Sequence, residues 1–263
     1  MCIVAGLRAQ SYKEVVEQAM NYTFKDSLTQ AEELFKKALK MDPKNARNAL
    51  LFSNLGTVQK RLGKTDEAIK SYTLGLNITP YATSILLNRA ALYLDKGMVD
   101  KAYLDYSNVI DLLPENIEAR LFRAYIYMNR REFDEARVDY NVVVRKDPKH
   151  KSARIGLIML DQYAGKPRAA HNGLNLLITD YPDDPSLLRM RANLELDENY
   201  PDAALEDLKA AIKIDPQNTE TICQLGDVYL LLHKKNDAKK AYEKAIDLGV
   251  PRSLLVDKLK SCK

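Results

Sequence analysis

The sequence predicts an all-α protein, an α-solenoid of about seven helix-turn-helix units with a further helix capping its C-terminal end. The first observation is a series of prolines spaced 34 residues apart, and the second is a series of alanines that keeps this step after an initial step of 37. The prolines are Pro80, Pro114, Pro148, Pro182 and Pro216, and the alanines are Ala31, Ala68, Ala102, Ala136, Ala170, Ala204 and Ala238. A fixed period of this length is typical of stacked units that share one continuous core.

Each period divides into two amphipathic helices, as the second unit illustrates. Its first helix carries apolar residues at helical spacing, namely Phe52, Leu55 and Val58. The turn around Gly63 ends that helix, and the second helix ends before Pro80, because proline cannot continue a helix and restricts the residue before it. The expected units are residues 12–45, 49–82, 83–116, 117–150, 151–184, 185–218 and 219–252. Residues 253–263 form the expected cap, since Leu255 and Leu259 lie four apart on an otherwise polar helix.

A small residue precedes six of the seven alanines by twelve places. These residues are Ala19, Gly56, Ala90, Ala124, Ala192 and Gly226, whereas the fifth unit has Ile158. A small residue where two helices cross lets their backbones approach, and a bulky one forces them apart. We therefore expect Ile158 to splay the fifth helix pair.

The composition fits an ordinary globular chain. Of 263 residues, 46% are hydrophobic and 29% are charged, and 40 Lys and Arg against 36 Asp and Glu give a net charge of +4. These values argue against a disordered, collagen-like or membrane protein as the class of the whole chain, and no apolar run approaches the roughly 18 residues that span a bilayer. The three cysteines, Cys2, Cys223 and Cys262, are too scattered for a disulfide framework or a metal site.

Residues 1–11 precede the first unit and allow two interpretations. Residues 2–7 are apolar and are followed by Arg8, which is similar to the end of a secretory signal peptide whose beginning is missing. In that case the protein is exported or periplasmic. In the other interpretation the segment is a frayed N-terminus and the protein is cytoplasmic.

The periodic segments resemble those of the tetratricopeptide repeat family, a 34-residue helix-turn-helix unit. The resemblance covers residues 12–252 and is carried by Asn54-Leu55-Gly56 with residues 66–72, by Asp134-Glu135-Ala136 with Tyr140, and by residues 225–229 with Ala241-Tyr242. It implies a right-handed superhelix whose first helices line a concave face and bind a peptide or a partner helix. It also implies a non-catalytic protein-interaction scaffold.

Three units share an arginine and an aspartate sixteen residues apart. The pairs are Arg89 with Asp105, Arg123 with Asp139, and Arg191 with Asp207, and the other four units have neither residue. A fixed separation across one helix pair predicts ion pairs between the two helices, with bidentate geometry where the fork of the guanidinium allows it. The alternative is an anion-binding row of arginines.

On the concave face that the resemblance implies, the second, fifth, ninth and twelfth places of each first helix form one stripe. In the middle units the stripe is apolar, with Leu87, Ala91, Leu94, Leu121, Tyr125, Met128, Ile155 and Met159, and Tyr163 just beyond. Polar residues flank it, including Lys60 and Arg61 on one side and Arg189 and Asn193 on the other. We expect these apolar residues, with Arg189 and Asn193, to bind a peptide or helix segment, and Tyr125 and Met128 to be accessible. The alternative is that the stripe packs between neighbouring first helices.

No catalytic, cofactor or metal motif accompanies these patterns. The three histidines, His150, His171 and His233, occupy different places in their units, and neither a phosphate-binding glycine loop nor a nucleophile motif is present. We therefore expect no enzyme activity and no cofactor, and a protein or peptide as the partner. The competing hypotheses are a nucleic-acid-binding helical repeat, disfavoured by the small net charge, and a self-assembling structural component.

Overall fold

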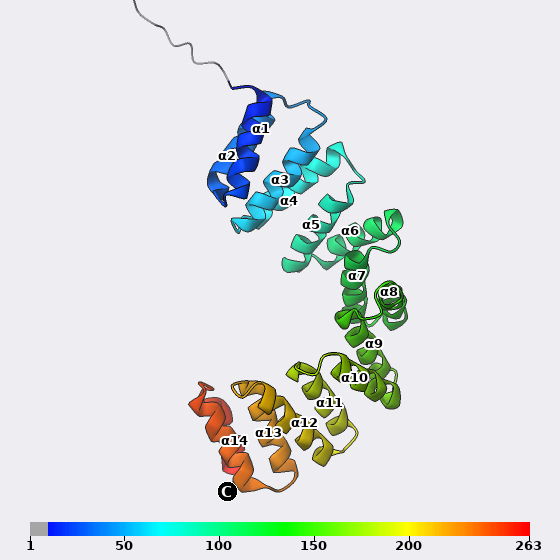
Figure 1. Ribbon diagram of the computed structural model, residues 1–263, viewed down its shortest axis with the longest axis vertical. Helices are drawn as coiled ribbons and strands as arrows, with labels where there is room; N and C mark the ends of the chain where they lie inside the picture. Colours follow the sequence, from blue (N-terminus) through cyan, green and yellow to red (C-terminus); the bar gives the residue numbers. More distant parts are fainter. Residues whose placement is uncertain (1–9) are drawn as a thin grey trace, which may run out of the picture. The chain divides into compact units, whose positions relative to one another are not determined.

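The computed structural model describes residues 10–263, and these residues form fifteen α-helices joined by short loops, with no β-strand among them (Figure 1). The expected all-α solenoid of helix pairs is therefore confirmed. No helix in the described part of the chain combines the length and the apolar character that crossing a membrane requires. The segment interpreted as a signal remnant lies outside the described residues.

The chain forms two compact units, residues 1–146 and 147–263. From here on, 'unit' means one of these two parts, and each helix pair is called a hairpin. The helices of the first unit are α1 (Tyr12–Phe24), α2 (Leu28–Met41), α3 (Asn48–Arg61), α4 (Thr65–Ile78), α5 (Thr83–Asp95), α6 (Val99–Leu112), α7 (Ile117–Arg130) and α8 (Phe133–Lys146). Those of the second unit are α9 (Lys151–Tyr163), α10 (Pro167–Asp180), α11 (Pro185–Asp197), α12 (Pro201–Ile214), α13 (Thr219–Leu231), α14 (Lys235–Asp247) and α15 (Arg252–Ser261).

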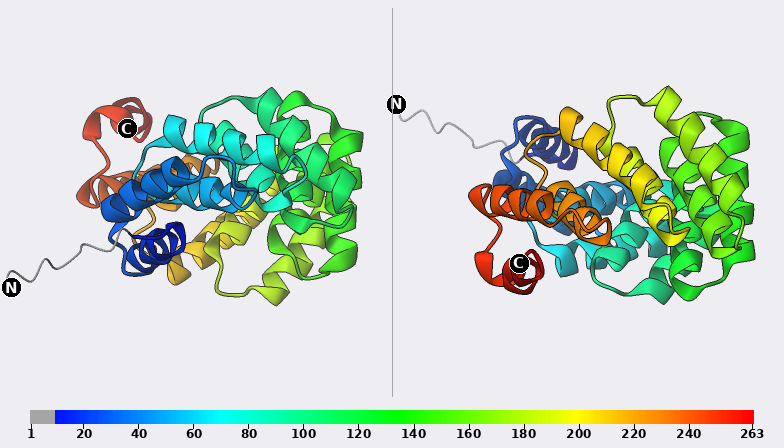
Figure 2. Two further views of the ribbon diagram at one scale, coloured as in Figure 1. Left: turned by 90° about the horizontal axis from the view of Figure 1, so that it is seen from above. Right: turned by 90° about the horizontal axis from the view of Figure 1, so that it is seen from below.

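Within each unit, an odd-numbered helix pairs with the next even-numbered one as a hairpin, and each hairpin packs on the following one. The last helix, α15, lies next to α14 at the end of the second unit (Figure 2). Leu255 on the inner side of α15 is buried, whereas Leu254 on its outer side is 71% exposed. Helix α15 therefore covers the apolar side of the last hairpin and turns most of its own surface to solvent.

The turn inside every hairpin contains one residue with a left-handed backbone, always at the same place in the 34-residue repeat. These residues are Asp26, Gly63, Gly97 and Arg131 in the first unit and Gly165, Asn199 and His233 in the second, with φ between 59° and 74°. Glycine adopts this conformation without strain, whereas other residues pay about 1–2 kcal/mol. The turn geometry is therefore common to all hairpins although only three of them contain the favoured residue.

The two helices of a hairpin meet at a crossing that has room for one large side chain. A Cβ added to Gly56 would lie 2.7 Å from the ring of Tyr72, and one added to Gly226 would lie 2.5 Å from the ring of Tyr242. Each glycine thus faces an aromatic ring that is fully buried. The aromatic side chain of the second helix fills the space that the small residue of the first helix leaves.

The fifth hairpin reverses this arrangement. Ile158 occupies the small-residue place on α9, and a Cβ added to Gly173 on α10 would lie 2.6 Å from its side chain. The helices of this hairpin also pack less extensively against each other than those of the other six. Gly173 therefore accommodates the bulk of Ile158, a compensation that the spacing of small residues on the first helices does not reveal.

Replacing Gly56 with isoleucine should lower the free energy of unfolding by about 1–3 kcal/mol, because overpacking a filled crossing displaces its neighbours. Adding Tyr72→Leu should restore part of this loss, since it removes the ring that the new side chain would meet. Urea unfolding followed by circular dichroism measures the effect, with Asn77→Ile on the exposed side of α4 as the control. Equal stability of Gly56→Ile and Asn77→Ile would contradict the crossing constraint.

A buried carboxylate joins the first hairpin to the second. Glu32 on α2 is 3% exposed, and its oxygens accept hydrogen bonds from Lys36 at 2.6 Å and from Lys64 at 2.7 Å. Gln59 on α3 donates to the same carboxylate at 3.2 Å and accepts from Ser71 at 2.7 Å. Burial alone would raise the pKa of Glu32, but these hydrogen bonds outweigh it and lower the pKa to about 2.

Acid should weaken this joint in a defined pH window. The pKa of Glu32 is lower in the folded protein than its ordinary value of 4.5, so its stabilising effect is complete above that value and is lost as the pH falls towards 2. The full effect is about 3 kcal/mol by linkage. We expect wild type to be more stable than Glu32→Gln near neutral pH, and the difference to shrink near pH 3.

Urea unfolding at several pH values measures this difference. The neighbouring, exposed Glu33 provides the matched control, since Glu33→Gln should leave the acid dependence unchanged. A pH-independent difference between wild type and Glu32→Gln would show that the carboxylate is not stabilised as described.

Candidate functional site

The apolar stripe divides into packed and accessible parts within the first unit. Leu87 and Leu94 on α5 are half-buried and pack against the core cluster that includes Ile85 and Leu86. Leu87 and Leu94 therefore contribute to the core of this unit. Only their outer edges remain available to a partner.

Helix α7 presents the more accessible part of the stripe. Tyr125 is 55% exposed, and Leu121 and Met128, one turn to either side on the same face, are half-buried. Beside them Phe122 is 39% exposed and stacks on the buried ring of Tyr106, with centroids 5.3 Å apart. This helix face therefore exposes an aromatic and apolar surface on a rigid, packed base.

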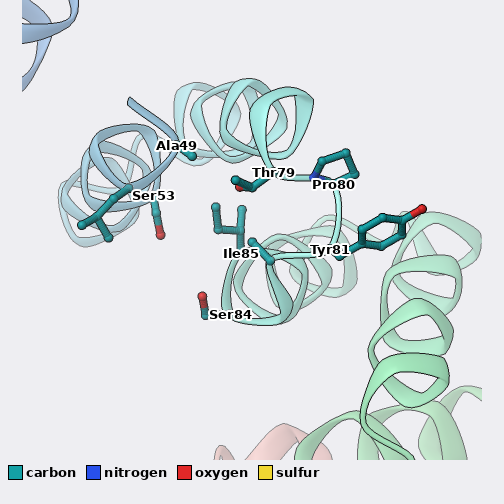
Figure 3. Close-up of a pocket in the computed structure, with 9 residues that line it drawn as sticks. Ala49, Ser53, Thr79, Pro80, Tyr81, Ser84 and Ile85 are labelled. Carbon is teal, nitrogen blue, oxygen red and sulfur yellow. The ribbon is translucent and has the colours of Figure 1, made fainter. Parts of the chain in front are cut away.

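A hollow of about 570 Å³ opens between α3 and α5 (Figure 3). Ala49, Leu50 and Ser53 line it from α3, and Ser84 and Ile85 line it from α5. The loop of residues 79–82 closes one end, and the ring of Tyr81 in this loop points away from the hollow. None of the lining residues is charged, so the hollow is apolar with a few hydroxyl groups at its edge.

This hollow belongs to the same stripe, at a position that we did not predict. Leu50 and Ser53 occupy the second and fifth places of α3, and Ser84 occupies the second place of α5. The spacing of the stripe therefore indicates these three residues, but they lie outside its apolar part, from which the binding residues were predicted. The wall formed by residues 79–82 follows no helical period and has no comparable signal.

The predicted binding residues of the second unit differ in accessibility. Ile155 packs against the cluster that contains Ile158, Met159 is half-buried, and Tyr163 is 61% exposed. Asn193 is exposed, whereas Arg189 donates to Glu220 at 2.5 Å and to Asn218 at 3.3 Å. Arg189 is therefore already held by the neighbouring hairpin.

The structure brings each predicted arginine and aspartate together in a bidentate ion pair. The Nε and Nη2 atoms of Arg89 donate to the two oxygens of Asp105, both at 2.8 Å, and the other pairs have the same geometry. Arg120 makes an additional hydrogen bond to Asp139. Burial of the Arg89 guanidinium lowers its pKa, and the hydrogen bonds to Asp105 outweigh this and raise it. The arginines therefore stay charged and paired.

The third edge of each guanidinium reaches back to the preceding hairpin. Its Nη1 atom donates to a polar side chain at one fixed place on the second helix of that hairpin. The acceptors are Thr73 for Arg89 at 3.0 Å, Ser107 for Arg123 at 3.4 Å and Asn175 for Arg191 at 2.6 Å. Each arginine thus joins two hairpins as well as the two helices of its own hairpin. In the sequence, the signal for this second role is the polar residue sixteen places before each arginine.

Truncating one of these arginines should be strongly destabilising. Arg89→Met leaves the carboxylate of Asp105, 3% exposed, without its counter-ion, and the cost of an unpaired buried charge is about 3–5 kcal/mol. Adding Asp105→Leu should recover much of that loss. Chemical denaturation measures both variants against Arg145→Met, an exposed position on α8. Wild-type stability of Arg89→Met would contradict a buried pair.

The histidines occupy structural places. His150 caps α9 by accepting a hydrogen bond from the backbone of Ala153, and His171 lies 2.6 Å from Glu198. His233 is the left-handed residue of its hairpin turn. Within residues 10–263, no three His, Cys, Asp or Glu side chains are grouped so that they could hold a metal ion. The accessible stripe and the hollow beside it therefore form the candidate site.

Models of the tetratricopeptide repeat match residues 16–45, 50–81, 156–219 and 219–248. A tetratricopeptide repeat protein from Parabacteroides merdae ATCC 43184, known from a crystal structure, is 30% identical to this chain. The similarity covers 97% of this chain and 99% of that one, with a TM-score of 0.74.

Two other proteins share part of this likeness. A chain in the crystal structure of the APC/C hetero-tetramer Cut9–Hcn1 is 15% identical with a TM-score of 0.60, over 98% of this chain and 57% of that chain, which is a likeness of fold alone. DnaJ homolog subfamily C member 7 from Homo sapiens is 36% identical over 94 residues, which are 35% of this chain and 19% of that protein. The match thus spans about a fifth of this relative.

Proposed function

The chain belongs to the tetratricopeptide repeat family, whose repeats generally mediate protein–protein interaction, and from this premise we propose that it is a non-catalytic scaffold that holds a peptide or helix segment on the first helices of its repeats. Within the first unit the proposed surface runs over α3, α5 and α7. The observation that carries the proposal is the combination of an exposed aromatic at Tyr125 with an uncharged hollow beside Ser53 and Ser84.

The hollow suits an apolar side chain of a bound segment. Its volume of about 570 Å³ is in the range of sites that enclose a ligand group, and its lining offers no charge to pair with an ionic side chain. The hydroxyl groups of Ser53 and Ser84 lie at its edge, where they can donate to a backbone carbonyl or accept from an amide of the segment. The hollow therefore supports an apolar anchor with hydrogen bonds around it.

Helix α7 suits a second, adaptable contact. Tyrosine and methionine contribute large contact areas, and methionine adjusts its shape to different partners. Tyr125 and Met128 lie on one face of the helix, and beside them Phe122 is held by stacking on the buried ring of Tyr106. A segment that contacts this face gains apolar burial without reorganising the core.

Selection of peptides from a random display library on the full chain tests the proposal. We expect selected peptides to be rich in apolar residues, and their affinity to fall by at least about tenfold for Tyr125→Glu and for Leu121→Asp, because a charge is then buried under the peptide. Ser84→Phe should weaken the same peptides by filling the hollow.

Tyr200→Glu provides the matched control, since Tyr200 is 61% exposed at the start of α12 in the second unit. Thermal unfolding of each variant establishes that it remains folded. Unchanged affinity of the selected peptides for all three surface variants would place their binding elsewhere and contradict the proposal.

A further inference from the structure

A second hollow lies on the opposite side of α3. It measures about 510 Å³ and is lined from α2, α3 and α4, with Phe52, Leu55 and Gln59 contributed by α3. Successive residues of a helix are rotated by about 100°, so these three residues face away from Leu50 and Ser53, which line the hollow of Figure 3. A partner in one hollow therefore leaves the other free.

Lysines dominate the edge of this second hollow. A neighbouring depression of about 460 Å³ along α2 shares Lys36 and Lys40 with it, and the linings of the two together contain four lysines and two glutamates. The lysines are Lys36, Lys37, Lys40 and Lys70, and the glutamates are Glu33 and Glu67. We name this surface the basic groove.

Only one of the four lysines of the basic groove, Lys36, forms an ion pair among residues 10–263, with Glu32 and Glu67. Lys36 pairs with the carboxylate of Glu32 at 2.6 Å, but Lys37 donates to the uncharged amide of Gln10. Lys40 and Lys70 are exposed and take part in no ion pair within residues 10–263. Three ammonium groups are thus available to carboxylates of a partner.

Exposed apolar side chains lie between these lysines. Leu74 on α4 is 38% exposed and lines the hollow together with the half-buried Leu39, and Met41 in the neighbouring depression is 41% exposed. An apolar floor with a positively charged edge is complementary to a segment that carries apolar residues on one side and carboxylates beside them.

We propose that the basic groove docks an acidic, amphipathic segment of a partner protein, at a site separate from the surface proposed above. The apolar residues of the segment cover Leu39, Leu74 and Met41, and its carboxylates pair with Lys37, Lys40 and Lys70. A nucleic acid fits less well, because the apolar floor has no counterpart in its charged backbone and the lining offers only the half-buried Phe52 for stacking of bases.

The probes are three synthetic peptides of the same length as α2. The first has leucine at helical spacing with glutamate elsewhere, the second replaces its glutamates with lysine, and the third replaces its leucines with serine. A single-stranded oligonucleotide is the fourth probe. Fluorescence anisotropy measures the binding of each to the full chain, and to the variants Lys40→Glu/Lys70→Glu, Leu74→Ser and Tyr125→Glu.

We expect only the first peptide to bind, and to bind Tyr125→Glu as well as wild type. Its affinity should fall by about tenfold or more for Lys40→Glu/Lys70→Glu and severalfold for Leu74→Ser. Lys213→Glu/Lys244→Glu, which alters two exposed lysines of the second unit, should bind normally.

Four results would overturn the inference: no binding of the first peptide, equal binding of the lysine peptide, preference for the oligonucleotide, or loss of binding in Tyr125→Glu but not in Lys40→Glu/Lys70→Glu. The last would assign the peptide to the opposite side of α3, so failure here is distinguishable from failure of the proposed function.

Discussion

The crossing of the two helices in a hairpin accommodates one large side chain, and the remaining structure depends on this constraint. In the second hairpin the small residue, Gly56, lies on the first helix and faces Tyr72 on the second helix. In the fifth hairpin the large residue, Ile158, lies on the first helix and faces Gly173 on the second. The size rule therefore applies to the sum of the two facing residues and not to either alone.

The joints between hairpins follow no such uniform rule. The first joint depends on the buried carboxylate of Glu32, and the next two depend on arginines that reach back to Thr73 and Ser107. At the joint between α6 and α7, where Arg123 reaches Ser107, the hydroxyl groups of Tyr103 and Tyr127 also meet at 3.2 Å. A repeat array needs only that neighbouring surfaces match, so joints along one chain can differ in their chemistry.

The fold could be predicted because its constraints act within one period. Prolines, alanines and small residues at a fixed spacing indicate the helices and the face on which they pair, and the spacing of arginine and aspartate indicates which side chains lie opposite each other. Gly173 was missed because compensation at a crossing involves a place that is not otherwise restricted to small residues. The periodic rule identified Tyr125 as a surface residue, but it treated Leu87 and Leu94 alike, although these contribute to the core.

The accessible hollows were harder to predict, for a physical reason. A hollow forms where side chains of two repeats and a loop leave a space, so it depends on residues from three segments and on the rotamers they adopt. In the loop of residues 79–82 only Pro80 belongs to a periodic pattern, and the lysines of α2 belong to none. Sequence periodicity describes what the repeats share, whereas the two hollows arise from what distinguishes one repeat from the next.

Each of these arginines divides its hydrogen bonds between its own hairpin and the preceding one, and this restricts how such an array can change during evolution. A hairpin that contains Arg89, Arg123 or Arg191 is complete only behind a neighbour that offers Thr73, Ser107 or Asn175. Placing that hairpin behind a neighbour without such an acceptor would leave one N–H of its guanidinium without a partner on the preceding hairpin. A hairpin with such an arginine can therefore be moved only to a position behind a hairpin that carries the matching acceptor, or together with that hairpin.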